Sequence, residues 1–403
     1  MDRARVLFLE ILNTALQGGQ FAGNDAVSAE DWQEVLRLAE IHKLLPLIYQ
    51  TAYTVPALRE MPAVRAKMRR QVVAQTVRTS EFLQLYGMLC EAGVTPLVVK
   101  GIVCRELYPE PDLRMSSDED ILIPAEQFDR CRAVMEAYGM RTPIDEEALA
   151  ETYEAPFRKQ DGVLYIELHK SLFPPESDAY GDWNRFFDGA FARARVAGAV
   201  RTLSHTDHVL YLLCHAFKHF LHSGFGIRQV CDIVMYLNAY GAEVDWNRVY
   251  ESCCAIRAEV FAAALLKIGR KHLGLDDAKA CIPDDWRETE VDETDMLEDL
   301  LSGGVYGSAS ESRVHSSNIT LDAVAADKRG KRAGASLKNS LFPSAKSLEG
   351  RYPYLKKHPY LLPAAWISRI VRYGRGAGNG KAAEAVKIGS ERVELLRKYR
   401  VIR

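Results

Sequence analysis

The chain has 403 residues, of which 48% are hydrophobic and 26% charged, with a formal net charge of −2. This composition is typical of a soluble globular protein of two or three domains and excludes a disordered, collagen-like or strongly basic chain. No apolar run approaches the roughly 20 residues that a membrane-spanning helix needs. Eight scattered cysteines without Cys-x-x-Cys spacing favour free thiols and a reducing, cytoplasmic location.

Residues 1–90 carry apolar side chains at helical spacing, as in Trp32, Val35, Leu36 and Ala39, so we expect an N-terminal helical region. The apolar stretch near the start of the chain is interrupted by Glu10, which is typical of a helix and not of an export signal. This region is predicted to pack in front of a catalytic α/β core over residues 91–175.

The first strand of that core is predicted over Thr95–Val99, followed by Lys100-Gly101 and a helix over Ile102–Leu107. A strand that stops at a glycine and opens a helix can offer backbone N–H groups to an anion. Lys100 and Gly101 are therefore candidates for binding a phosphate. An ordinary strand–helix turn with a surface lysine is the competing interpretation.

An Asp-x-Asp pair precedes the next strand, which is predicted over Ile121–Ile123. Side chains two residues apart on a strand share a face, so Asp118 and Asp120 would project together. Two neighbouring carboxylates are costly to keep ionised without a cation, and a few carboxylates plus substrate phosphates suit Mg²⁺. The pair predicts metal-assisted phosphoryl or nucleotidyl transfer. A solvated turn is the alternative.

A third carboxylate follows in the strand predicted over Val163–His169. Glu167 shares a face with Tyr165 and His169, whereas the leucines and isoleucine between them face the other way. Glu167 would complete a three-carboxylate site as a ligand or as a base, unless this face is simply exposed. Arg114, Ser116 and Ser117, just before the Asp pair, are candidate phosphate contacts.

Residues 176–275 are predicted to be helical again. A helix beginning at Ser204 or Thr206 would carry His215, His219 and His222 on one face, and Arg228 and Asp232 are four residues apart in the next helix. Zinc is disfavoured, since there is neither a metalloprotease Glu nor a Cys pair nearby. Hydrogen-bonded core histidines and a buried Arg–Asp brace are expected.

Charge is uneven towards the C-terminus. Residues 276–299 hold eleven acids, and a Gly/Ser-rich stretch follows, so 276–327 is expected to be an acidic linker or loop. Residues 328–403 hold nineteen Lys or Arg against four acids. This basic helical region predicts contact with a polyanion, an anionic membrane surface or the acidic part of the same chain. No recognisable nucleic-acid module accompanies it. The stretch Tyr360–Tyr373 is expected to dock on the core through Leu362, Trp366, Ile370 and Tyr373, with an interfacial membrane helix as the alternative.

Several ordered motifs in this chain closely resemble the uncharacterised nucleotidyltransferase family, within the DNA polymerase β-like nucleotidyltransferase superfamily. The likeness runs from about Val94 to Arg375, and its motifs are Leu97-Val98-Val99-Lys100-Gly101, Leu107-Tyr108-Pro109, Arg114, Asp118-Glu119-Asp120, Ile166-Glu167-Leu168-His169, His215-x-x-x-His219, Arg228-x-x-x-Asp232, Leu341-Phe342-Pro343-Ser344, Arg351-Tyr352-Pro353 and Leu361-Leu362-Pro363.

The resemblance implies an α+β fold, in which a small mixed β-sheet forms a nucleotidyltransferase core embedded in a mainly helical protein. Asp118, Asp120 and Glu167 match the superfamily's catalytic carboxylates, which hold Mg²⁺ or Mn²⁺. His169, His215, His219, Arg228 and Asp232 would face the substrate or support the site. Lys100-Gly101 departs from the usual Gly-Ser turn, so the contacts to the triphosphate are open.

The expected activity is transfer of a nucleoside monophosphate from an NTP such as ATP to a hydroxyl or phosphate acceptor, with release of pyrophosphate. The competing hypothesis is a non-catalytic nucleotide-binding protein, or a membrane or partner adaptor, that keeps the fold. A cytoplasmic protein, peripheral to the membrane through 328–403, fits both.

Overall fold

The computed structural model describes residues 1–23, 27–176, 179–305, 311–330, 345–348, 352, 354–368 and 379–403. They form two compact units. The first comprises Met1–Glu176, Tyr180–His215 and Ile227–Glu293, and the second contains Ala216–Gly226 and Thr294–Arg403. None of the described helices is long and apolar enough to span a membrane.

A mixed sheet of seven strands lies in the first unit and confirms the predicted α+β class. Its spatial order is β3-β4-β5-β2-β1-β7-β6. The strands are β1 Leu97–Val98, β2 Glu119–Leu122, β3 Met140–Arg141, β4 Glu154–Lys159, β5 Tyr165–His169, β6 Arg195–Ala197 and β7 Val200–Thr202. Pairs β2/β5 and β1/β7 are parallel, and the other pairs are antiparallel.

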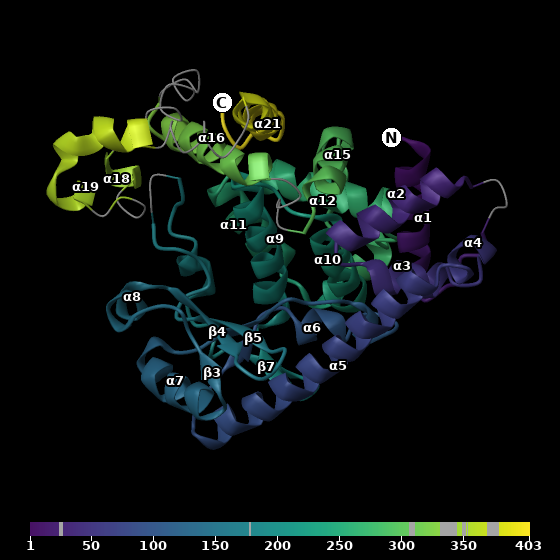
Figure 1. Cartoon of the computed structure of the whole chain (residues 1–403), viewed down its shortest axis with the longest axis horizontal. Coiled ribbons are helices and arrows are strands. Elements are labelled where there is room, and N and C mark those ends of the chain that lie inside the picture. The colour runs from purple at the N-terminus through teal and green to yellow at the C-terminus, as the bar shows by residue number, and fades with distance from the viewer. Residues whose placement is uncertain are drawn as a thin grey trace. The chain divides into compact units, whose positions relative to one another are not determined.

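Helices before and between the strands build part of the first unit. They are α1 Arg3–Leu16, α2 Ala29–Ile41, α3 Leu45–Ala52, α4 Pro56–Arg59, α5 Pro62–Glu91, α6 Ile102–Arg105, α7 Phe128–Ala137 and α8 Glu146–Glu151, with short 3₁₀ turns η1 Pro111–Leu113, η2 Ala125–Gln127 and η3 Asn184–Phe187. Figure 1 shows α5 and α7 below the strands, with α9 and α10 above them.

The helical part after the sheet begins with α9 His205–Leu221, and Ser204 is its N-cap because its hydroxyl accepts from the Asp207 N–H at 3.1 Å. The other helices of the first unit are α10 Ile227–Tyr240, η4 Gly241–Glu243, α11 Trp246–Ala255, α12 Glu259–His272, α13 Asp277–Ala280 and α14 Asp284–Arg287. From Ala216 onward, the last residues of α9 belong to the second unit.

The remaining elements of the second unit are α15 Thr294–Gly303, α16 Glu311–Lys328, α18 Ala345–Leu348, α19 Tyr354–Lys357, η6 Pro359–Leu361 and α21 Asn379–Lys398. The stretch 276–327, expected to be a linker or loop, therefore differs from expectation and contains α13 to α16. Met296, Leu297, Leu300 and Leu301 recur at helical spacing and are buried, which explains α15 despite its acidic surroundings.

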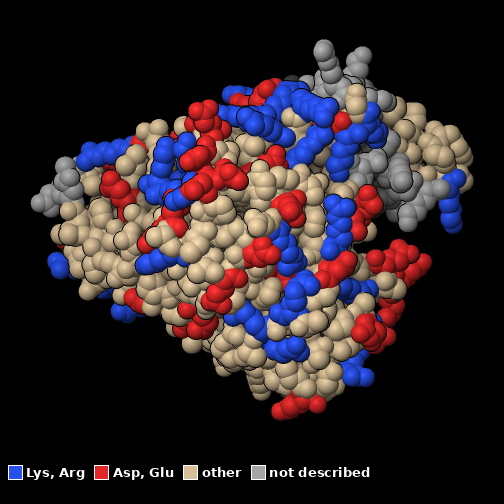
Figure 2. Space-filling view, turned by 180° about the vertical axis from the view of Figure 1, so that it is seen from behind, with Lys and Arg blue, Asp and Glu red and all other residues tan. Residues whose placement is uncertain are grey.

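The basic C-terminal region pairs partly with this acidic stretch, within the second unit. Buried Asp299 lies between Arg313 and Arg392, with Arg392 Nη1 2.6 Å from Asp299 Oδ2, and Lys398 forms an ion pair with Asp295. One of the three predicted partners, the acidic part of the same chain, is thus used. Figure 2 shows acidic and basic side chains interspersed on one face.

Leu362 and Trp366 pack against a buried cluster of Leu348, Tyr352, Leu355 and Ala365, all from the same C-terminal stretch, so docking of this stretch on the core of the protein stays a prediction. Predictions that concern Leu341-Phe342-Pro343-Ser344, Arg351, Pro353, Ile370 and Tyr373 lie outside the described residues.

Candidate active site

The parallel register of β2 and β5 places two carboxylates side by side. Asp120 is paired with Glu167, and Leu122 with His169. Register partners project to the same face of a sheet, so Asp120, Glu167 and His169 share one face. Ile121, Ile166 and Leu168 are fully buried on the opposite face, where they anchor both strands in the core. Burial of that face is what fixes the register of the carboxylates.

Asp120, Glu167 and His169 offer ligand atoms that all lie within 4.8 Å of one another. His169 Nε2 lies 3.3 Å from Asp120 Oδ1, and both side chains are buried. Asp120 Oδ2 accepts no hydrogen bond but faces the Lys100 ammonium at 2.9 Å. Two adjacent carboxylates with one oxygen free of hydrogen bonds fit a divalent cation, and His169 is placed to orient Asp120.

The two carboxylates differ in their preferred protonation state. Burial would raise the pKa of Asp120, but Lys100 and the hydrogen bond from His169 outweigh it and hold the pKa well below its usual range. Burial raises the pKa of Glu167 to about 8, and the neighbouring charge of Asp120 adds to this effect. A cation at this position would favour ionised Glu167, because it would offset the repulsion between the carboxylates.

Lys100 links the strand face to helix α9. Its Nζ lies 3.5 Å from His215 Nε2 as well as 2.9 Å from Asp120 Oδ2. The predicted site residues Lys100, His169 and His215 thus all lie around Asp120. His219, the other predicted histidine of α9, belongs to the second unit, as does His222.

Asp118 precedes β2 by one residue and is buried. It is not a member of the group formed by Asp120, Glu167 and His169. Its charge nevertheless contributes to the raised pKa of Glu167, so it lies within electrostatic range of the group. The structure therefore brings two of the three predicted carboxylates together, and Asp118 borders them.

The turn at Gly101 is built around another carboxylate. Gly101 has φ 53° and ψ −116°, and the next N–H, that of Ile102, donates to Glu119 Oε2 at 2.8 Å. Arg105 Nη2 also lies 3.0 Å from Glu119 Oε1. Glu119 was not among the predicted site residues. Since it already accepts from the first N–H of α6, a phosphate would compete with it at this turn.

The segment before Asp118 is clamped by α10. Arg114 Nε donates to Asp232 Oδ1 at 3.0 Å, and Tyr108 donates to the same oxygen at 2.8 Å. Arg228 donates to the Met115 carbonyl. The predicted brace thus exists with different partners: Asp232 pairs with Arg114 across the fold, and not with Arg228 one turn away.

The two predicted serine contacts are also engaged. Ser116 Oγ accepts from Arg105 at 2.8 Å and donates to Glu119 at 3.2 Å, and its N–H donates to Gln75. Ser117 Oγ accepts from Lys43. Ser116 thus belongs to a buried network that supports the loop, whereas Ser117 contacts a lysine of the N-terminal region.

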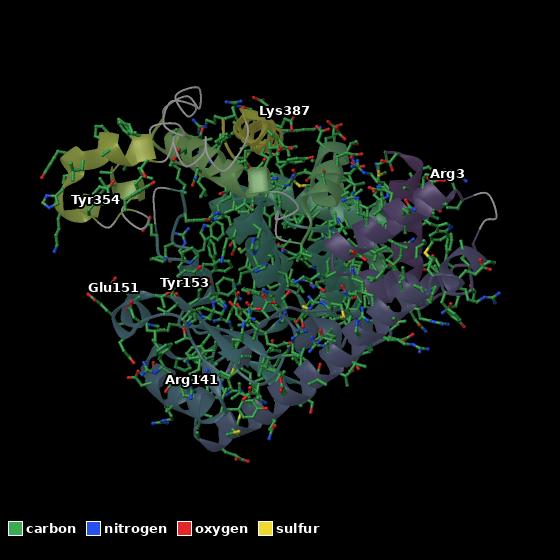
Figure 3. The ribbon with its side chains drawn as sticks, viewed as in Figure 1. Arg3, Arg141, Glu151, Tyr153, Tyr354 and Lys387 are labelled. Atoms are coloured by element: carbon green, nitrogen blue, oxygen red, sulfur yellow. The ribbon has the colours of Figure 1, made fainter. Side chains whose placement is uncertain are left out.

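Sequence reasoning missed four side chains around this face: Lys43, Arg78, Tyr153 and Tyr211. Burial and the charges of Asp120, Glu167 and Asp118 raise the pKa of Tyr211, on α9. Burial, Glu154 and Glu167 raise that of Tyr153, which Figure 3 labels beside Glu151 at the end of α8. None follows a motif, because the fold alone brings these distant positions together.

A family model described as "Uncharacterised nucleotidyltransferase" matches residues 28–274, which is more than half of the chain. The chain belongs to this family. No curated protein and no solved structure matches the chain. The matched range includes most of the N-terminal helical region and ends before the acidic stretch, whereas the predicted likeness ran from about Val94 to Arg375. The C-terminal motifs therefore lie outside the match.

Proposed function

We propose that this protein is a metal-dependent nucleotidyltransferase. It transfers a nucleoside monophosphate from an NTP to a hydroxyl or phosphate acceptor and releases pyrophosphate. The observation that carries the proposal is the β2/β5 register, which sets Asp120 beside Glu167 and His169 in a member of a nucleotidyltransferase family. Free cysteines throughout the chain support a reducing, cytoplasmic setting.

Asp120 and Glu167, with Asp118 at their border, would hold Mg²⁺ or Mn²⁺. When bound, the ion supplies positive charge to the phosphates and lowers the pKa of an attacking hydroxyl. His169 fixes the orientation of Asp120 through its hydrogen bond. Lys100 is within reach of both Asp120 and His215, and it can shift from the carboxylate to a phosphate oxygen as charge builds there.

The reaction is a displacement at the α-phosphorus. An acceptor oxygen forms the new P–O bond, and the bond from the α-phosphorus to the bridging oxygen of the β-phosphate breaks. Pyrophosphate leaves with that electron pair. The proton of an acceptor hydroxyl passes to ionised Glu167 or to solvent. The positions of Asp120 and Glu167 on neighbouring strands keep their spacing fixed throughout.

The decisive experiment measures pyrophosphate release and label transfer from each α-phosphate-labelled ribonucleoside triphosphate, with Mg²⁺ or Mn²⁺, using small-molecule and protein fractions of a cell extract as acceptors. Asp120→Asn should abolish transfer, and EDTA should do the same to the unchanged protein. Asp161→Asn, which alters an exposed acid in the turn between β4 and β5, is the matched control and should retain full transfer.

Nucleotide binding without transfer in every fraction would instead favour the non-catalytic alternative. Transfer that survives in Asp120→Asn would reject the assignment of the site.

A further inference from the structure

Three basic side chains from separate elements converge on the segment 115–117, just before Asp118. Lys43, after α2, donates to Ser117 Oγ. Arg78, on α5, donates to the Ser116 carbonyl at 2.6 Å, and Arg228, on α10, donates to the Met115 carbonyl. We call Lys43, Arg78 and Arg228 the cation cluster. All three belong to the first unit and to the range matched by the family model.

The two arginines of this cluster are not paired with a carboxylate as the neighbouring cations are. The other buried cations nearby each have a carboxylate partner, in the pairs Lys100–Asp120, Arg105–Glu119 and Arg114–Asp232. Among the described residues, neither Arg78 nor Arg228 forms an ion pair. Arg228 is only 4% exposed, and its Nε has no hydrogen-bond partner there. A buried guanidinium without a counter-ion is costly, which indicates that an anion completes its surroundings.

Lys43 has a backbone conformation that glycine would adopt with less strain. Its φ is 55°, and it follows the last turn of α2, with its N–H bonded to the Glu40 carbonyl and the next N–H to that of Ala39. This is the left-handed C-terminal position of a helix, where the absence of Cβ usually favours glycine. A lysine at this position, unlike a glycine, supplies a side chain that reaches Ser117.

The cation cluster adjoins the carboxylates through Asp118. Burial and the charge of Arg228 lower the pKa of Lys43, while Asp118 raises it, so these groups act on one another directly. The charge of Asp118 also acts on Arg78 and on Glu167. The atoms that the three cations hold belong to residues 115–117, which run directly into Asp118 and β2, and Asp118 lies within electrostatic range of Lys43 and Arg78.

We propose that Lys43, Arg78 and Arg228 bind the polyphosphate of the nucleoside triphosphate, beyond the phosphorus that reacts. This inference rests on the proposed function and names the subsite that it requires. Guanidinium groups suit phosphate oxygens because they donate two hydrogen bonds in a fixed plane. Helices α2, α5 and α10 thereby contribute to nucleotide binding, not only to packing.

The experiment measures binding of inorganic tripolyphosphate to the full chain by calorimetry in EDTA, where neither metal nor turnover contributes. Arg78→Met and Lys43→Met should each raise the Kd about tenfold or more, since each removes charged hydrogen bonds. Arg70→Met, an exposed arginine of the same helix α5, is the control and should leave the Kd unchanged. Circular dichroism checks that each variant is folded. Arg228→Met is used only if it folds, because Arg228 also supports Met115.

Equal Kd values for the unchanged protein, Arg78→Met and Lys43→Met would overturn the inference, as would absence of tripolyphosphate binding by the unchanged protein. If tripolyphosphate binds through these residues while no NTP supports transfer, the subsite stands and the proposed function fails. If transfer occurs but the variants keep the tripolyphosphate Kd, the function stands and the subsite fails.

Discussion

Glu167 is the residue of the candidate active site whose ionisation is unfavourable in the folded protein. It lies beside the ionised Asp120, and its pKa is raised to about 8. In the unfolded chain a glutamate has a pKa near 4.5. The folded protein therefore holds a proton that the unfolded chain releases, and its stability declines as the pH rises from about 4.5 to about 8.

We expect Glu167→Gln to abolish transfer but to stabilise the metal-free protein at pH 8 to 9. The gain is on the order of 1–3 kcal/mol, because the neutral amide avoids the burial of a charge and the repulsion by Asp120. At pH 5 both proteins carry an uncharged group there, so the gain should largely disappear. Urea unfolding at the two pH values in EDTA measures it. An equal effect at both would show that repulsion is not the cause.

Gly101 tests how tightly the turn before α6 is built. A Cβ there would lie 1.8 Å from Glu119 Oε2, and the φ of 53° disfavours any L side chain. Gly101→Ala should lower the free energy of unfolding by at least about 2 kcal/mol. Gly87→Ala is the matched control, since its Cβ would meet nothing within 4 Å inside α5, and alanine should stabilise that helix. Similar stabilities for the two variants would contradict this account of the turn.

Site residues could be predicted from the sequence where strand geometry sets the direction of the side chain. They could not be predicted where only tertiary contacts bring them to the site. Asp120 and Glu167 could be predicted, because alternation and an apolar opposite face set the direction of each side chain. Lys43 and Arg78 could not, since their helices carry no pattern that points to β2. Glu119 was hidden because its parity places it opposite the Asp pair, where a buried carboxylate needs the helix N–H and Arg105 that only folding supplies.

Among the elements, α10 determines how the loop before β2 is held. Its Asp232 accepts from Arg114 and Tyr108, and its Arg228 holds the next carbonyl. These contacts fix the backbone only a few residues before Asp118 and Asp120. Helix α10 contributes no metal ligand, but it thereby fixes the position of the backbone from which Asp118 and Asp120 project.

We expect Asp232→Asn to destabilise the protein by roughly 3–5 kcal/mol, because it leaves the buried Arg114 guanidinium without a counter-charge. Glu243→Gln, which removes an ion pair between a 60% exposed acid and His205, should cost less than about 1 kcal/mol. Denaturant unfolding of both variants tests the contrast. Comparable losses would show that the Arg114–Asp232 pair is not what holds the loop.

Helix α9 carries a buried histidine, His208, that makes the fold sensitive to acid. The Thr202 hydroxyl donates to the Val98 carbonyl, so its oxygen accepts from the His208 Nδ1–H at 3.2 Å. Burial lowers the pKa of His208 to about 3. Stability is therefore full above the unfolded value of about 6.5 and is lost as the pH falls towards 3.

We expect His208→Asn to reduce this pH dependence by up to about 1.4 kcal/mol per pH unit between pH 6 and pH 4. Asparagine keeps a donor for Thr202 but does not titrate, although it packs less well against Tyr236. Unfolding free energies at several pH values give the slope. An unchanged slope would mean that His208 is not the group that titrates.

The strands that lie in apolar runs were easier to predict than the others. Strands β1, β2 and β5 lie in such runs, whereas the short strands β3, β6 and β7 do not, and β4 contains a proline and charged residues. Such short strands form because a neighbour offers hydrogen bonds, and no local pattern announces them. The helices of 276–327 were not predicted although a local pattern was present. Apolar residues recur there at helical spacing, but the many acidic residues between them favoured the interpretation as a linker or loop.

At the scale of the whole molecule, the excess of basic residues in 328–403 is only partly matched by Asp295 and Asp299. Leu362 and Trp366 pack against the C-terminal cluster and are partly buried, whereas Tyr360 and Ile367 are 73% and 63% exposed. We expect contact with an anionic membrane to be electrostatic, because it would rest on the excess of basic residues. The acids that pair with this region belong to the same unit, which limits how much charge is left for a partner.

We expect the full chain to float with vesicles rich in phosphatidylserine at low salt and to be released at about 1 M salt, where charges are screened beyond roughly 3 Å. Neutral phosphatidylcholine vesicles are the control and should not bind it. Flotation with neutral vesicles, or binding that resists salt, would show that apolar side chains insert and would contradict a purely electrostatic contact.

The contact between Lys100 and Asp120 has a consequence for how the protein behaves between turnovers. Because the chain supplies its own ammonium to the most acidic carboxylate, it can remain folded when magnesium is scarce. A metal ion that binds Asp120 must displace the Lys100 ammonium. Its net binding energy is therefore only the difference between its own attraction to Asp120 and that of Lys100. The free metal ion would therefore bind weakly, and it would bind more strongly once a triphosphate draws Lys100 away from Asp120. Lys100 alone would then determine whether the triphosphate or the metal ion binds first.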